Sequence, residues 1–291
     1  MLKHWLYLFF LALIAPSGPS AAQMQSGEIR KASLPLSQHM LVEIVVKQPA
    51  LAIDVLPRAG VVFSGGFAVP SFSPGDVKAA EQAIALLRER AGELELGAMI
   101  ADAAARKLDR DTFAPELAIE MLVLPSGTIY PRRDRPPQKR VMVLEPRFGF
   151  NASASELKLS IQLQIEDRIS VDGRSRARPQ FLTSATFAYT APDIAEAGDR
   201  DTRLALWAVH VANRDRFRQL LRDAVDPAFD MLNAAFLTRN EKPDRTQIHK
   251  ESVDGVSTKL AVLKEQGGRR WFKLAPTTVG LMRSVGPLPA D

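Results

Sequence analysis

The sequence contains no cysteine. That absence excludes disulfide bonds, thiolate metal sites and a cysteine nucleophile, together with the lipid-modified cysteine that anchors bacterial lipoproteins. Histidine is also scarce, with four in 291 residues, and no two histidines have the i, i+4 spacing of a helical metal-binding pair. We therefore expect neither a metal ion nor another cofactor.

Positive charge is only slightly in excess. Lysine and arginine number 38 against 33 aspartates and glutamates, which gives a formal net charge of +5. Such an excess permits weak attraction to an anionic membrane or polysaccharide surface. Aromatic residues do not interleave with the arginines, as they do in many proteins that bind nucleic acids, so we expect no nucleic acid among the partners.

The longest apolar run, WLYLFFLALIA, lies at residues 5–15. Lys3 precedes it, Pro16 follows it, and small residues lead up to Ala22, which is the pattern of a signal peptide. An uncleaved anchor is the alternative, but eleven residues form a helix of about 16 Å and a bilayer core is about 30 Å thick. We expect cleavage near Ala22 and a periplasmic or secreted protein.

The middle of the chain has a regular alternation. Leucine or isoleucine occupies every second position from Leu157 to Ile165, with polar residues between them. This period of two predicts a half-buried strand. Residues 140–150 alternate less regularly, and the polar residues 151–155 between the two segments predict a hairpin connection. We take this hairpin as the centre of a sheet.

Three segments have helical periodicity. The first is expected from Pro74 to Gly92, because proline suits the first position of a helix and glycine its end. The second is expected at 97–108, and a long third helix at 202–239, kinked by Pro227. Further strands are expected at residues 41–47, 51–56, 117–124, 181–190, 258–264 and 269–274, a linker at 130–140, and a basic turn at 171–179.

These elements predict an α+β protein, with a mixed α/β arrangement as the alternative. We expect a largely antiparallel sheet covered by helices, with the long helix in the C-terminal half. The expected divisions are a signal peptide (1–22), a flexible leader (23–40), a strand-helix-helix-strand unit (41–130), and a sheet with its covering helix and C-terminal hairpin (131–291). The last two units are compatible with a single domain.

One candidate contact loop lies between residues 61 and 73. Its central residues are Phe63, Ser64, Gly65, Gly66 and Phe67. The glycine spacing matches neither a P-loop nor a dinucleotide fingerprint. The aromatic side chains are either tucked beneath the following helix or available to a partner or ligand.

Two basic stretches flank the central hairpin and form a second candidate surface. They contain Arg132, Arg133, Arg135, Arg174, Arg176 and Arg178. Both stretches are expected at one rim of the sheet, where they either contact an anionic surface or are simply solvated.

No catalytic motif is present, because Ser64 lacks the glycine pattern of a nucleophile elbow and the histidines stand in no motif. The order of elements is similar in layout to several small periplasmic accessory proteins of transport and outer-membrane assembly systems. We therefore expect a non-enzymatic accessory or binding module of the cell envelope, whose partner is an envelope protein or small ligand. An exported hydrolase, with a site assembled from dispersed residues such as Ser64 and His210, is the alternative.

Overall fold

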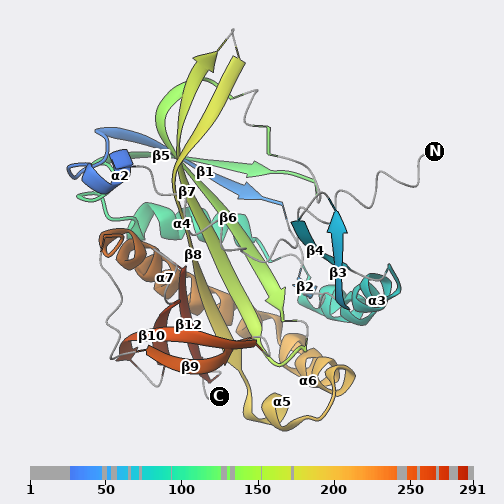
Figure 1. Ribbon diagram of the computed structural model, residues 1–291. Coiled ribbons are helices and arrows are strands. Elements are labelled where there is room, and N and C mark those ends of the chain that lie inside the picture. The colour runs from blue at the N-terminus through green and yellow to red at the C-terminus, as the bar shows by residue number, and fades with distance from the viewer. Residues whose placement is uncertain are drawn as a thin grey trace.

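The fold is organised around one ten-stranded sheet (Figure 1). The computed structural model describes residues 27–47, 51–53, 58–64, 67–71, 74–92, 94–125, 130–131, 135–151, 153–171, 174–240, 248–253, 256–266, 269–274 and 281–287. The strand order is β5-β1-β6-β7-β8-β12-β11-β10-β9, and β2 also pairs with β6. The strands are β1 (His39–Val46), β2 (Ala52–Ile53), β5 (Glu116–Val123), β6 (Gln138–Phe150), β7 (Leu157–Val171), β8 (Arg174–Thr190), β9 (Ile248–Val253), β10 (Val256–Gln266), β11 (Arg269–Leu274) and β12 (Leu281–Pro287).

The sheet is mixed, and the expectation of a largely antiparallel sheet is wrong. β1 is parallel to β5 and to β6, β2 is parallel to β6, and β8 is parallel to β12, whereas the remaining neighbours are antiparallel. Parallel neighbours are joined by long crossovers. Such pairs therefore have no short turn motif from which the sequence could predict them. The α+β character is retained, since helices cover this mixed sheet.

The central hairpin is present as the alternation predicted. β6 and β7 are antiparallel, with Phe150 opposite Leu157, and Ile161 is fully buried while Gln162 beside it is partly exposed. The connection is held by side chains, because the backbone N–H of Glu156 donates to Asn151. β8 extends this unit, but it begins at Arg174, within the stretch that was expected to be a turn.

Six helices are described: α2 (Gly27–Lys31), α3 (Pro74–Ala91), α4 (Leu96–Lys107), α5 (Pro192–Glu196), α6 (Arg200–Ala212) and α7 (Arg214–Leu237). α3 starts at Pro74 and ends before Gly92, whose φ of 66° is the left-handed geometry that glycine tolerates. The helix expected at 202–239 is two helices. They divide at Asn213, whose side chain accepts from the N–H of Arg216 and caps α7. None of the described helices is long and apolar enough to cross a membrane.

The main core lies between one face of the sheet and α4 and α7. Alternate residues of β1 and β6, such as Ile44 and Leu144, face these helices. From α7, the ring of Phe236 lies 5.0 Å from those of Phe113 and Phe181, centroid to centroid. Burial of these side chains supplies the dominant stabilising term.

The C-terminal strands are tied to the centre by a stacked arginine. The Arg269 guanidinium of β11 lies over the rings of Phe187 and Tyr189 on β8, at 3.8 and 4.7 Å from their centroids. It also donates to the carbonyl of Ala188. Burial lowers the pKa of Arg269 to about 10, so the group remains a cation at neutral pH and can stack on aromatic faces.

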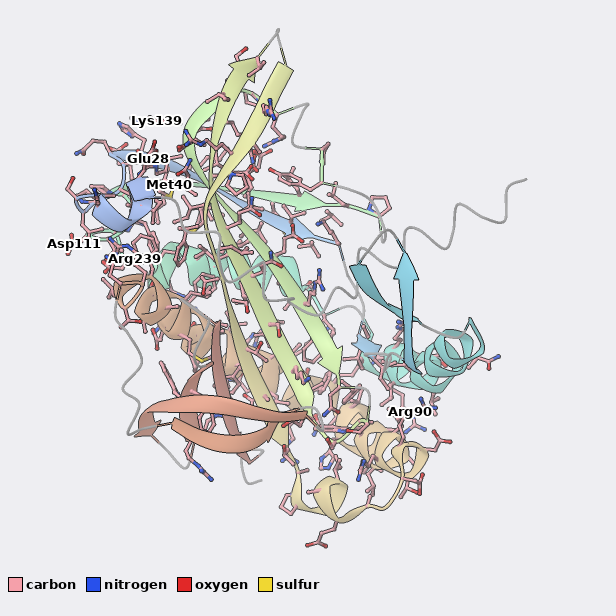
Figure 2. The ribbon with its side chains drawn as sticks, in the orientation of Figure 1. Glu28, Met40, Arg90, Asp111, Lys139 and Arg239 are labelled. Carbon is pink, nitrogen blue, oxygen red and sulfur yellow. The ribbon has the colours of Figure 1, made fainter. Side chains whose placement is uncertain are left out.

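Part of the expected flexible leader, residues 23–40, is packed against the body. In α2, Ile29 is fully buried, and its carbonyl accepts from Arg239 Nε at 3.3 Å. Figure 2 shows Glu28 and Arg239 at the same end of the molecule. The backbone of Leu36 and Ser37 also donates to residues 112 and 113. These contacts hold residues 29–37 against the body although their composition is largely polar.

Candidate functional site

One feature of the sheet was not predicted, a group of charged side chains on the face opposite the main core. β5 and β6 lie on either side of β1 and are both parallel to it, so the chain between them must cross β1. The described part of this crossover covers the second sheet face, where Tyr130 packs with Val45, Val141 and Val143. Residues 130–140, expected as a solvated linker, thus contribute a buried side chain.

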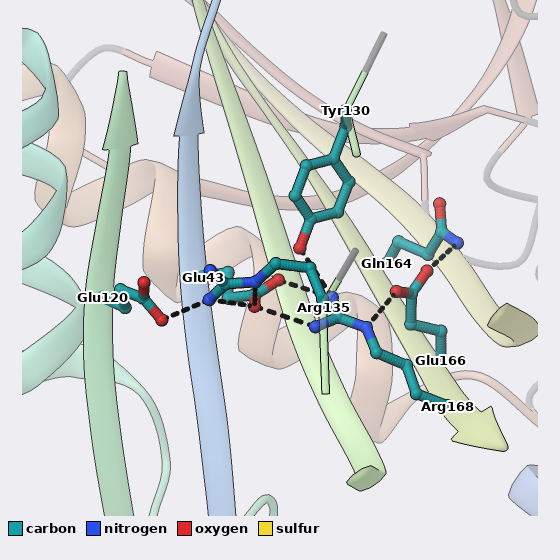
Figure 3. Close-up of polar contacts among 7 residues, drawn as sticks. All are labelled: Glu43, Glu120, Tyr130, Arg135, Gln164, Glu166 and Arg168. Carbon is teal, nitrogen blue, oxygen red and sulfur yellow. Dashed lines mark hydrogen bonds and ion pairs between the residues drawn. The ribbon is translucent and has the colours of Figure 1, made fainter. Parts of the chain in front are cut away.

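Charged and polar side chains on this face, some of them from the crossover itself, form the buried charge cluster (Figure 3). Its members are Glu43, Glu120, Tyr130, Arg135, Gln164, Glu166 and Arg168. Glu43 on β1 stands directly opposite Glu120 on β5, an unfavourable pairing of like charges unless a cation intervenes. That cation is Arg135, which donates to both carboxylates.

Arg168 is the second cation of the buried charge cluster and comes from β7. Its Nη1 donates to Glu43 Oε1 at 2.8 Å and its Nε to Glu166 Oε1 at 2.9 Å. Its Nη2 is shared between the other oxygen of Glu43 and the hydroxyl of Tyr130. Glu43, Glu166 and Arg168 are fully buried at their side chains. Such a fully desolvated group is stable only while each charge keeps its partner.

The protonation states within the buried charge cluster follow from these contacts. Burial alone would raise the pKa of Glu43, but the hydrogen bonds and charges of Arg168 and then Arg135 outweigh it and hold the pKa below its ordinary value. The bonds to Glu43 and Glu166 likewise overcome desolvation and raise the pKa of Arg168. Glu43 is therefore ionised at neutral pH and cannot serve there as a general acid.

A short projection, which we call the arm, extends directly beyond the buried charge cluster. It consists of residues 169–171 of β7 and 174–178 of β8, and it stands at the top of Figure 1. The last β6 pairing on this side is that of Gln138 with Arg168. A bulge between Ile165 and Glu166 precedes it. Beyond Arg168, β7 is paired with β8 alone among the described strands.

One face of the arm combines apolar and basic residues. Ile169 is 47% exposed and Val171 is 37% exposed. Their partners across the ladder are Arg176 and Arg174, and residues directly opposite each other in an antiparallel pair share a face. Arg168 precedes Ile169 by one residue and therefore points to the other face, into the buried charge cluster.

The six arginines expected to form one basic surface are divided. Arg135 is turned inward to Glu43 and Glu120, a role that its proline-rich surroundings did not suggest. Arg176 and Arg178 are exposed on the arm, with Arg178 Nη1 at 3.8 Å from Glu28 Oε1 of α2. Arg174 starts β8, and its side chain lies outside the described residues, as do Arg132 and Arg133 altogether.

The candidate loop is a hairpin that forms a small second sheet. β3 (Arg58–Ser64) and β4 (Phe67–Ser71) are antiparallel, with Phe63 opposite Ala68 and Ser64 opposite Phe67. Gly65 and Gly66 lie outside the described residues, as do the side chains of both strands. Whether Phe63 and Phe67 are buried or available to a partner therefore stays a prediction.

One pair of side chains bears on the hydrolase alternative. His210 Nε2 lies 3.4 Å from Asp193 Oδ2 near the surface, and its ring lies beside that of Trp207. Three further observations would be needed for a triad, namely a hydroxyl, a cleft and an oxyanion donor. In the part of the chain that the structure describes, no group of three or more histidines and carboxylates could hold a metal ion.

Comparisons with known proteins add little to this geometry. No family model matches the chain, and no curated protein matches it. A solved structure titled "Crystal structure of uncharacterized protein" is similar over 64% of this chain and 95% of its own, at 14% identity and a TM-score of 0.17. A likeness at that score carries no argument about fold or function.

The sequence contained faint signals of the buried charge cluster. Glu43 is the single acid within the apolar segment LVEIVV, and Glu166, Asp167 and Arg168 end an otherwise regular alternation. Charged residues at strand positions that should face a core are expected to have partners. The partners themselves come from segments far apart in the chain, which no local pattern connects.

Proposed function

We propose that this protein is an exported, non-enzymatic binding module of the cell envelope whose contact element is the arm. The observation that carries the proposal is the exposure of Ile169 and Val171 on a projecting hairpin, with arginines opposite them. Apolar side chains cost free energy when they remain in water. Exposed together at the end of a projection, they are typical of a surface that is covered by a partner.

The buried charge cluster supports this proposal because it fixes the base of the arm. Arg168, the last residue before the arm, is held by Glu43 of β1 and Glu166 of β7. A contact element that is already ordered loses less conformational entropy when it binds. In this interpretation the buried charge cluster serves positioning, and the arm serves recognition.

Export is proposed on the sequence of residues 1–22, which lie outside the described residues. The apolar run at 5–15, followed by small residues up to Ala22, is suited to a signal peptidase. Replacing Leu8 and Leu11 with arginine should interrupt that run and leave the precursor in the cytoplasm. N-terminal sequencing of the exported protein should begin at Gln23, and a start at Met1 would favour the uncleaved anchor.

A site-specific photo-cross-linker tests the role of the arm. Installed at Ile169 in cells that express the chain, it should give adducts with protein or lipid of the envelope. The matched control is Val209 of α6, which is 69% exposed and lies away from the arm. Adduct yields at Val209 that equal those at Ile169 would show that the arm has no special role in contact.

A further inference from the structure

We propose that the arm docks on the surface of an anionic phospholipid bilayer. This inference rests on the proposed function, because it names the partner of the arm. Its starting point is the pairing of Ile169 with Arg176. This pair places an apolar side chain and a cation side by side on one face of the hairpin.

That combination matches the chemistry of a bilayer interface. Isoleucine and valine side chains can enter the boundary between head groups and acyl chains. Guanidinium groups bind lipid phosphates through paired hydrogen bonds. The long aliphatic part of an arginine side chain lets its charge reach the head groups while the strand lies deeper in the interface. Arg176 and Arg178 are both exposed and can make such contacts.

The size of the apolar part favours lipid over a folded protein. The two exposed apolar side chains of the arm, Ile169 and Val171, make a small patch. A stable protein interface buries about 800 Å² on each partner. A bilayer needs no such area, because several weak contacts to phosphates add together at one surface. Among the described residues on this face, the acids near the arm are Glu28, which lies near Arg178, and Asp167, which is paired with Arg140. In the sequence, Asp172 also follows Val171.

The geometry gives the binding a predicted character. A small apolar insertion combined with a few arginines should be weak, reversible and sensitive to salt. Screening shortens the reach of charges from about 10 Å at 0.1 M salt to about 3 Å at 1 M. Binding should therefore require anionic lipid and fall steeply as the salt concentration rises.

Vesicle co-sedimentation tests the inference with the protein purified from the envelope fraction without detergent. Vesicles of phosphatidylcholine that contain about 30% phosphatidylglycerol are compared with vesicles of pure phosphatidylcholine. The anionic lipid supplies the negative surface that attracts basic residues. The protein should sediment with the anionic vesicles at low salt and not with the neutral ones. Absence of sedimentation with both, or equal sedimentation with both, would overturn the inference.

Two variants with matched controls locate the binding surface. Arg176→Gln with Arg178→Gln should lower the partition coefficient roughly 25-fold, at about five-fold for each arginine. The control removes the same charge from exposed positions of α7, as Arg216→Gln with Arg222→Gln, and should change the partition coefficient by less than about three-fold. An equal loss in the control pair would show attraction by net charge alone and would overturn docking through the arm.

The apolar contribution is tested in the same way. Ile169→Ser with Val171→Ser should lower the partition coefficient by about five-fold or more. The control, Leu86→Ser with Val209→Ser at two exposed apolar positions on helices, should leave the partition coefficient unchanged. Cross-linking at Ile169 separates this inference from the proposed function. Protein adducts without vesicle binding would refute the lipid inference and keep the arm as a contact element, while absence of both would refute both.

Discussion

Arg168 and Arg176 lie near each other on the two strands of one hairpin, yet their environments are opposite. Arg168 is fully buried among carboxylates, whereas Arg176 is exposed. The cause is the register, because successive residues of a strand point to opposite faces. Arg168 meets Glu43, and Arg176 stands opposite Ile169, beyond the end of β6. A basic run in a sequence therefore does not define a basic surface.

The largest expected effect concerns a carboxylate without a cation beside it. Ile161→Asp places a charge on the fully buried, apolar face of β7, where it lacks the arginines that surround Glu43. The free energy of unfolding should fall by about 4 kcal/mol or more, measured by urea denaturation. Gln162→Asp, one residue further and partly exposed, should cost about 1 kcal/mol or less. Equal losses would contradict the assignment of the two faces.

The next expected effect compares the two arginines directly. Arg168→Met removes the cation that Glu43 and Glu166 share and leaves Glu43 with Arg135 as its remaining arginine partner, which should cost about 3–5 kcal/mol. Arg176→Met, on the exposed face, should change the free energy of unfolding by no more than about 0.5 kcal/mol. Thermal and urea unfolding of both variants check this. Similar destabilisation by the two substitutions would mean that the contrast in burial has no energetic counterpart.

The smallest expected effect is a pH dependence specific to the buried charge cluster. Because the pKa of Glu43 is lower in the folded protein than its ordinary value of 4.5, its stabilising contribution is complete above about pH 5 and is lost as pH falls through the folded value. Glu43→Gln should be less stable at neutral pH, and its free energy of unfolding should change less between about pH 5 and pH 3. Parallel pH profiles for the two proteins would argue against a lowered pKa.

Local elements could be predicted from the sequence because their causes are local. The alternation from Leu157 to Ile165 marks β7, and Pro74 and Gly92 mark the ends of α3. A capping residue such as Asn213 is a weaker signal, since polar residues are common on helix surfaces. The division between α6 and α7 was therefore missed.

Strand order and the buried charge cluster could not be predicted, because both depend on contacts between distant segments. The hydrogen bonds of Arg168 join β7 to Glu43 of β1 and to Tyr130 in the crossover. Glu43 within its apolar segment indicates that a partner is needed, but no local pattern identifies Arg168 or Tyr130. The arm was likewise expected as a basic turn, since its pairing is fixed by register with β7 and not by its own composition.

The parallel pairing of β8 with β12 has a consequence for how the chain assembles. β6, β7 and β8 follow one another along the chain and can pair through short connections. The outer edge of β8 becomes paired only when β12 is added, with Leu281 opposite Ser184. Contacts between such distant residues form slowly. Until β12 arrives, a central strand is open to pairing with other chains, and a chain that ends before Leu281 would keep this aggregation-prone edge.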